Sequence, residues 1–356
     1  MTKNDIIKAP WKYLTIIKYI NYTLGDMFDK FGFPKELRAI LAGRIGNLSA
    51  SPKEVSFLMY AAMDVAYADS AFFPKKGMEN FINEIRGVIE SNAECKILLN
   101  TKVTAIKINE DNVVKYIKTT KCRVKGKKYI SNLDPHLTFI LADKERLPKK
   151  YAKKLKYNYS DSIFCIYLGL KGISLKEHGF KKRNIWHHGD FDLDKEYWKE
   201  IKNDNFSHPW LFISAPSLLT DKGVLCPIGH ETLEILTFAN HNHFKKLFNS
   251  SRAEYKERVN EIYNAILDVV EKNYIPEIRK YIDKSIVHMP VDMEKILNIP
   301  KGNVYGCRVT PKNFNYNRIT SETPISNLHL VGASASFPGI MGVTVGALDL
   351  LEKLEN

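Results

Sequence analysis

Small residues gather near the carboxyl end of the chain, where backbone could approach a ligand closely. The segment Gly332-Ala-Ser-Ala-Ser336 follows an apolar strand predicted over 328–332. Further glycines place bare backbone at the start of the next predicted helix, from about 342 to 354, and one turn inside it: Gly339, Gly342 and Gly346. A helix N-terminus has free N–H groups and a partial positive charge, which suits a phosphate or the electron-rich edge of a reduced flavin. Close packing of loop against helix is the alternative explanation of these glycines.

Two histidine pairs are further candidates for chemistry, His187-His188 and His241-Asn-His243. Neither pair has carboxylates at the spacing that a metal site requires, so surface or hydrogen-bonded histidines are favoured over metal ligands. No side chain stands out as a catalytic acid or base. We therefore predict no metal site.

The pattern of apolar residues predicts the elements that position the carboxyl-terminal segment. Alternation over 102–108 and 113–119, around a polar turn, predicts a β-hairpin, and 128–131 a further strand. Between about 136 and 300, helices and strands are mixed. The strand candidates there are 163–170, 210–214 and 232–238, and the amphipathic helix covers 252–274.

The amino-terminal segment 6–28 has apolar residues at the spacing of one helix face: Trp11, Leu14, Ile17, Ile20 and Leu24. A helix that packs this face inward is the favoured interpretation. The alternative is an interfacial helix on a membrane, with Trp11 near the headgroups. The most apolar run, 55–73, is interrupted by Asp64 and Asp69, which predicts a buried helix and not a membrane span.

Several motifs occur in the order found in phytoene desaturases, carotenoid isomerases and retinol saturases, and the chain resembles that family over roughly residues 33 to 356. The ending Leu328-His-Leu-Val-Gly332, with its small-residue loop and Pro338-Gly339, is similar to the family's final strand and helix start. Tyr129-Ile-Ser-Asn-Leu-Asp-Pro135 resembles the stretch that closes the FAD domain, and Gly302-Asn-Val-Tyr-Gly306 the one before the final strand.

This resemblance implies an FAD-dependent oxidoreductase acting on a polyene or another hydrophobic small molecule. It implies that Val103 turns its backbone toward the adenine ring, and that Gly332 and Ala333 lie beside the FAD chain. The residues implied to lie under the isoalloxazine ring are Gly339, Met341, Gly342 and Val343. NAD(P) is left open as an electron donor or acceptor.

The glycine-rich turn that holds the FAD pyrophosphate in such enzymes is missing, because no G-x-G-x-x-G occurs in this sequence. We therefore expect weak or no FAD affinity, and hence doubtful enzyme activity, for this chain alone. An upstream chain carrying that unit is an expected partner in a split enzyme. A non-catalytic remnant and a basic peripheral membrane-binding protein are the alternatives.

The predicted fold class is α/β, with an incomplete Rossmann-like FAD-binding domain and a substrate domain of mixed sheet and helices. The FAD-binding part is predicted from 71–135 and 300–356, without its amino-terminal βαβ unit. The substrate- or membrane-facing part is predicted from 1–70 and 136–299.

The chain is basic, with 53 Lys and Arg against 40 Asp and Glu and a net charge of +13. A Lys-rich proteome explains this, as does an anionic partner such as a membrane surface or a phosphate-bearing cofactor. No zinc-finger spacing or RNA-binding aromatic signature accompanies the charge, so nucleic acid is not expected. Five scattered cysteines and a polar start without a signal peptide predict a cytoplasmic protein, with membrane association as an option.

Overall fold

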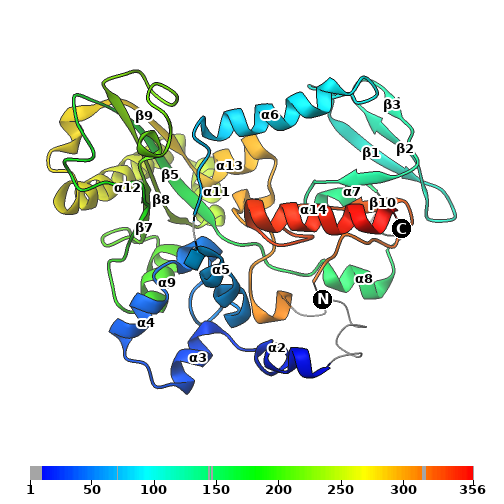
Figure 1. The fold of residues 1–356 in the computed structure, drawn as a ribbon, viewed down its shortest axis with the longest axis horizontal. Coiled ribbons are helices and arrows are strands. Elements are labelled where there is room, and N and C mark those ends of the chain that lie inside the picture. Colours follow the sequence, from blue (N-terminus) through cyan, green and yellow to red (C-terminus); the bar gives the residue numbers. More distant parts are fainter. Residues whose placement is uncertain (1–9, 70, 143–144, 146, 315–317, 356) are drawn as a thin grey trace. The chain divides into compact units, whose positions relative to one another are not determined.

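The computed structural model describes residues 10–69, 71–142, 145, 147–314 and 318–355 (Figure 1). The chain forms two compact units, each discontinuous in sequence. Unit 1 comprises 1–91, 161–304 and 309–311, and unit 2 comprises 92–160, 305–308 and 312–356. These boundaries differ from those predicted from the sequence: residues 71–91, 300–304 and 309–311 belong to unit 1, and residues 136–160 belong to unit 2.

Unit 1 is built on a five-stranded sheet in the order β6-β7-β8-β5-β9. Its strands are β5 (Ser162–Lys171), β6 (Ile185–His187), β7 (Leu211–Ser214), β8 (His230–Ala239) and β9 (Ile282–His288). All four strand pairings in this sheet are antiparallel. Parallel strand pairing is found in unit 2 instead. The three strands predicted for this region are confirmed.

Apolar side chains at every second position of β5 contribute to the core of unit 1, because alternate side chains point to the same face of a strand. Phe164, Ile166, Leu168 and Leu170 are all buried and share one cluster with helical residues such as Phe244 and Ile266. The helices that supply apolar residues to this cluster are α11 (His241–Ser250), α12 (Arg252–Asn273) and α13 (Pro290–Leu297). Helix α9 (Leu193–Asn203) contributes Tyr197 and Ile201 to a smaller cluster.

The amino-terminal region of unit 1 is helical: η1 (Pro10–Tyr13), α2 (Leu14–Tyr19), α3 (Leu24–Lys30), α4 (Lys35–Leu41), η2 (Ile45–Leu48), α5 (Phe57–Asp69) and α6 (Gly77–Ser91). The prediction of a single inward-packing helix over 6–28 is wrong for the described residues of that range. Thr23 and Asp26 form a capping box that starts a separate helix, α3. Before that break, α2 buries none of its residues, and Trp11 and Leu14 are 67% and 61% exposed.

Unit 2 contains the predicted hairpin, β1 (Val103–Ile108) and β2 (Val114–Thr119), extended by β3 (Arg123–Val124), which was not predicted. Strand β4 (Tyr129–Ser131) pairs in parallel with β10 (Leu328–Leu330), about 200 residues further along the chain. The unit's helices are α7 (Pro135–Leu141), α8 (Lys149–Lys154) and α14 (Gly339–Glu355). Buried residues from β1, β2, β4, α7 and β10 form one core. The α/β class is therefore confirmed.

Short helical turns complete the described elements: α10 (Pro216–Leu219), η4 (Ile278–Tyr281), η5 (Pro300–Gly302) and η6 (Pro311–Asn313). Among the residues that the structure describes, no helix combines the length and apolar character that crossing a bilayer requires. Helix α5 is only half-buried, since Val65 and Tyr67 are exposed, so it is less buried than the sequence predicted.

Candidate functional site

The carboxyl-terminal strand, loop and helix of unit 2 form the candidate site. Strand β10 lies parallel to β4, and the N–H of Val331 donates to the carbonyl of Ser131 at 2.9 Å. Parallel strands end at the same edge of a sheet, so Gly332 lies against Asn132. Gly332 has φ +99°, and a Cβ there would lie 2.6 Å from Asn132 Oδ1. Both the backbone angle and the lack of space require glycine at this position.

The glycines of helix α14 differ in what surrounds them. A Cβ on Gly342 would lie 2.5 Å from the carbonyl oxygen of Phe337, and one on Gly346 would lie 2.2 Å from Cβ of Ser336. The preceding loop therefore packs directly on the helix at both positions. Gly339 has φ +82° and nothing within 4 Å of its Cβ position. Close packing accounts for Gly342 and Gly346, whereas Gly339 leaves open space at the helix N-terminus.

The remaining residues predicted to contact the cofactor lie in the same unit. Met341 is 66% exposed on the first turn of α14, and Val343 is half-buried. The carbonyl of Ala333 accepts a hydrogen bond from Nη2 of Arg318 at 3.2 Å. Val103 begins strand β1, pairs with Thr119 and packs against the core of the unit. The carboxyl-terminal residues are thus collected in one segment, whereas Val103 lies on another element. Their contact with a flavin stays a prediction.

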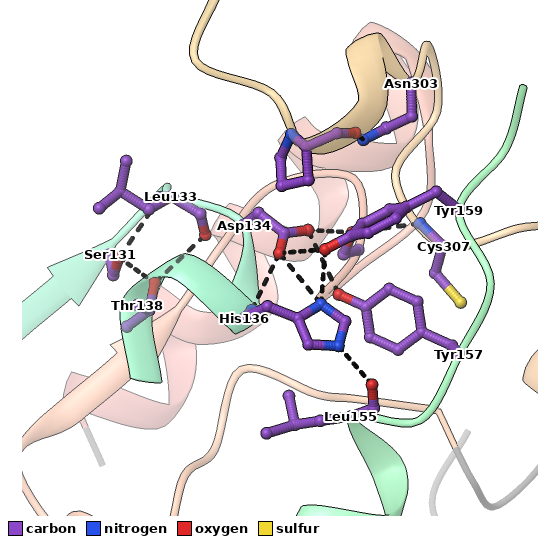
Figure 2. Close-up of polar contacts among 12 residues, drawn as sticks. Ser131, Leu133, Asp134, His136, Thr138, Leu155, Tyr157, Tyr159, Asn303 and Cys307 are labelled. Atoms are coloured by element: carbon purple, nitrogen blue, oxygen red, sulfur yellow. Dashed lines mark hydrogen bonds and ion pairs between the residues drawn. The ribbon is translucent and has the colours of Figure 1, made fainter. Parts of the chain in front are cut away.

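A partly buried polar cluster, which the sequence did not predict as a site, lies beside this segment. Figure 2 shows the carboxylate of Asp134 surrounded by His136, Tyr157 and Tyr159. Tyr159 donates to Oδ1 at 2.7 Å, and Tyr157 donates to Oδ2 at 3.3 Å. His136 Nδ1 lies 3.3 Å from Oδ1, while its Nε2 donates to the carbonyl of Leu155.

Hydrogen bonding decides the charge of this cluster. Burial alone would raise the pKa of Asp134, but hydrogen bonds from His136 and Tyr159 outweigh burial and hold that pKa below its ordinary value. Burial, together with the nearby Asp134 charge, raises the pKa values of Tyr157 and Tyr159. At neutral pH the cluster therefore consists of one ionised carboxylate and two protonated phenols.

The cluster positions the small-residue loop. Ser334 Oγ donates to Asp134 Oδ2 at 3.4 Å, and the N–H of Cys307 donates to Ser334 Oγ at 3.1 Å. Asp134 also caps helix α7, because its Oδ1 accepts from the N–H of His136 at 2.9 Å. The local signal was an Asp followed by Pro at a strand end, which is typical of a helix start. The tyrosines and Ser334 come from distant segments and had no such signal.

The histidines considered as metal ligands have protein partners. His188 Nδ1 lies 2.7 Å from Glu196 and its Nε2 donates to the carbonyl of Gly43, while His187 Nδ1 lies 2.8 Å from the hydroxyl of Tyr274. In the second pair, His241 Nε2 is 3.2 Å from a Glu294 oxygen without forming a hydrogen bond to it, and His243 Nε2 is 3.1 Å from an Asp204 oxygen. Within the described residues, no group of three or more potential ligands could hold a metal ion.

Comparison with known proteins identifies the family of this fold. The family model described as flavin containing amine oxidoreductase matches residues 20–346. The chain belongs to this family. An oxidoreductase from Methanosarcina mazei superposes with a TM-score of 0.63 at 16% identity, covering 99% of this chain and 73% of that one. A putrescine oxidase bound to putrescine superposes with a TM-score of 0.62 at 13% identity, covering 95% and 69%.

Two curated relatives are similar in sequence over nearly the whole chain. The all-trans-retinol 13,14-reductase of Danio rerio is 26% identical over 351 residues, which is 93% of this chain and 57% of the relative. The 4,4'-diaponeurosporene oxygenase of Staphylococcus aureus is 22% identical over 366 residues, covering 99% and 69%. The chain thus spans little more than half the length of that retinol reductase. The expected resemblance to retinol saturases and carotenoid enzymes is confirmed.

Membership of this family implies a flavin cofactor, and the candidate segment fits the ring side of one. The open space at Gly339 and the exposed first turn of α14 leave the N–H groups of a helix start accessible to an electron-rich ring edge. No G-x-G-x-x-G cradle for the pyrophosphate occurs in the sequence. The family description does not mention NAD(P), nor do the names of the relatives given above.

Proposed function

We propose that this chain forms the ring-side and substrate-side part of an FAD-dependent oxidoreductase that acts on a hydrophobic molecule such as a polyene. The observation that carries the proposal is Gly339, where a left-handed glycine opens space in front of the N-terminus of α14. Gly342 and Gly346 let the preceding loop pack directly on the same helix. The names of the retinol and diaponeurosporene relatives support a hydrophobic substrate.

In this proposal each residue of the segment has a limited task. The backbones of Gly332 and Ala333 lie beside the FAD chain, and Asp134 holds their loop in place through Ser334. The first-turn N–H groups of α14 would stabilise negative charge on a bound flavin ring, and Met341 would lie against that ring. Val103 takes the adenine side. Bound FAD supplies hydride transfer, while the protein supplies orientation and an apolar environment.

Exposed apolar side chains on α14 favour a partner segment that carries the glycine-rich unit. Five large apolar side chains of this helix are 45–66% exposed: Ile340, Met341, Val345, Leu348 and Leu351. On β4, Ile130 is also 56% exposed. Several exposed apolar residues along one helix are typical of an interface. The occupant that we propose is a strand–G-x-G-x-x-G–helix segment, encoded upstream or on a separate chain.

Flavin absorbance of the purified chain tests both the flavin site at Gly339 and the need for a partner segment. We expect little bound flavin with the chain alone, and clearly tighter FAD binding when a segment with the glycine-rich unit is co-expressed. Gly339→Val should abolish that binding, whereas Gly87→Val, on an exposed helix of unit 1, should not. FAD binding that is unchanged by Gly339→Val would contradict the proposed site.

Membrane association is a second candidate, favoured by the amino-terminal helices. Trp11, Leu14 and Ile17 are 67%, 61% and 41% exposed, and their spacing places them on one face of a helical segment. An exposed Trp among apolar neighbours suits the headgroup region of a bilayer. Binding to anionic vesicles tests this candidate, with the variants given in the Discussion.

A further inference from the structure

A strongly basic pocket lies within unit 2 and has no role in the function proposed above. Its volume is about 370 Å³, and its wall includes five cationic side chains: Lys153, Lys154, Lys156, Lys312 and Arg318. No aspartate or glutamate is among its described lining residues. Ser334, from the small-residue loop, forms part of the same wall.

Arg318 is held rigidly at this pocket. Its guanidinium lies 4.1 Å from the ring centre of Phe314 and 4.9 Å from that of Phe337, and its Nη2 donates to the carbonyl of Ala333. Stacking between aromatic rings and one hydrogen bond fix the plane of the group. The guanidinium is therefore oriented before any ligand arrives.

The guanidinium of Arg318 also lacks a hydrogen-bond partner at one of its nitrogens. Its Nη1 is buried and has no hydrogen-bond partner among the described residues, and no described carboxylate forms an ion pair with it. Burial lowers the pKa of Arg318 to about 10, so the group still carries its charge at neutral pH. A buried donor without a partner destabilises the fold, and more so when it is charged. An anion in the pocket would relieve that cost.

The lysines add positive charge without described counter-ions. Lys154 Nζ donates to the backbone carbonyl of Arg318 at 3.3 Å, which ties helix α8 to this wall. Lys153, Lys156 and Lys312 are exposed at the rim and form no described ion pair. Like charges that converge on a concave surface raise the local positive potential and attract anions.

We propose that this pocket binds a phosphate group, with Arg318 at its base and the lysines around it. A planar guanidinium binds two phosphate oxygens at once, while ammonium groups act as point charges. The volume exceeds that of one phosphate, so a pyrophosphate or a phosphate ester fits. The phosphate belongs either to the flavin itself or to a separate ester. The inference does not depend on the flavin site at Gly339.

Calorimetric titration of the full chain with pyrophosphate at low ionic strength tests this site. The double variant Lys153→Gln/Lys156→Gln should raise the Kd about tenfold or more, a loss of about 1.4 kcal/mol. The double variant Lys149→Gln/Lys150→Gln removes the same amount of charge from the start of α8, outside the pocket, and should change the Kd less than about twofold. Arg318→Gln should weaken binding further, and Arg318→Lys should restore it in part.

Competition identifies the source of the phosphate. If FAD displaces pyrophosphate and riboflavin does not, the site takes the flavin's own phosphates. If FAD and pyrophosphate bind together, the site takes a separate phosphate ester. Equal losses in the two lysine variants, or no binding of pyrophosphate at millimolar concentration, would overturn the proposal. Because pyrophosphate binding is measured without flavin, and flavin absorbance reports on the site at Gly339, failure of this site and failure of the flavin site are distinguishable.

Discussion

The hydroxyl of Tyr159 donates a 2.7 Å hydrogen bond to Oδ1 of Asp134, which joins the segment after α8 to the start of α7. The other oxygen of the same carboxylate accepts from Ser334 in the candidate flavin loop. One buried charge thus fixes three segments that are distant in sequence. Its removal should be measurable both in stability and in the order of the loop.

Replacement of Asp134 by Asn should lower the free energy of unfolding at pH 7 by about 1–3 kcal/mol. Asn retains the helix cap but loses the charge that the tyrosines and His136 stabilise. The folded pKa of Asp134 lies below the ordinary value of 3.8, so its contribution is complete above that value and is lost as the pH falls through the folded pKa. Urea unfolding between pH 3 and 7 should therefore show a shallower acid dependence in the variant.

Asp349→Asn is the control for that measurement, because Asp349 is an exposed residue of α14 with no described partner. It should change stability by less than about 0.5 kcal/mol at every pH. An unchanged acid limb in Asp134→Asn would show that the cluster is not ionised as described.

Two glycine-to-alanine changes in helices should have opposite effects. Gly346→Ala in α14 places a Cβ 2.2 Å from Cβ of Ser336, so the loop must shift, and we expect a loss of about 1–3 kcal/mol. Gly87→Ala in α6 meets nothing within 4 Å, and should stabilise the helix by about 0.5–1 kcal/mol. Thermal unfolding of both variants measures this difference, and a neutral Gly346→Ala would show that the loop does not pack on α14.

Cysteine reactivity should separate buried thiols from exposed ones. Cys165 is fully buried in β5, and burial raises its pKa to about 12, so it is protonated and inaccessible at pH 8. Cys95 and Cys122 are exposed. Iodoacetamide labelling followed by mass spectrometry should modify Cys95 and Cys122 within minutes, but Cys165 only after unfolding. Rapid labelling of Cys165 in the folded chain would contradict the closed core of unit 1.

Vesicle binding should depend on the exposed face of the amino-terminal helices, if this segment contacts a membrane. Trp11→Ser/Leu14→Ser should reduce co-sedimentation with anionic vesicles by about tenfold or more, because two large apolar side chains are lost from the interface. Phe191→Ser removes an apolar residue that is 61% exposed elsewhere in unit 1, and should leave binding unchanged. Equal binding by all three proteins would argue against this membrane surface.

Local patterns in the sequence predicted many of the elements. The hairpin of β1 and β2, the strands β5, β7 and β8, and the helix α12 all follow from side-chain periodicity and turn residues. Helix α14 was predicted too, although it begins at Gly339 and not near 342. Periodicity alone failed at α2, because a capping box at Thr23 interrupts the pattern and nothing in a periodic pattern tells whether a partner covers the apolar face.

The order of the sequence motifs was enough to indicate the family and to single out the segment that contains Gly332, Gly339 and Met341. Only the tertiary structure decided that Gly342 and Gly346 are closed by the loop and that Gly339 is open. It alone paired β4 with β10 and brought Tyr159 and Ser334 to Asp134. The physical reason is that spacing encodes the conformation of a segment, whereas burial, charge pairing and cavities arise between segments that the sequence keeps far apart.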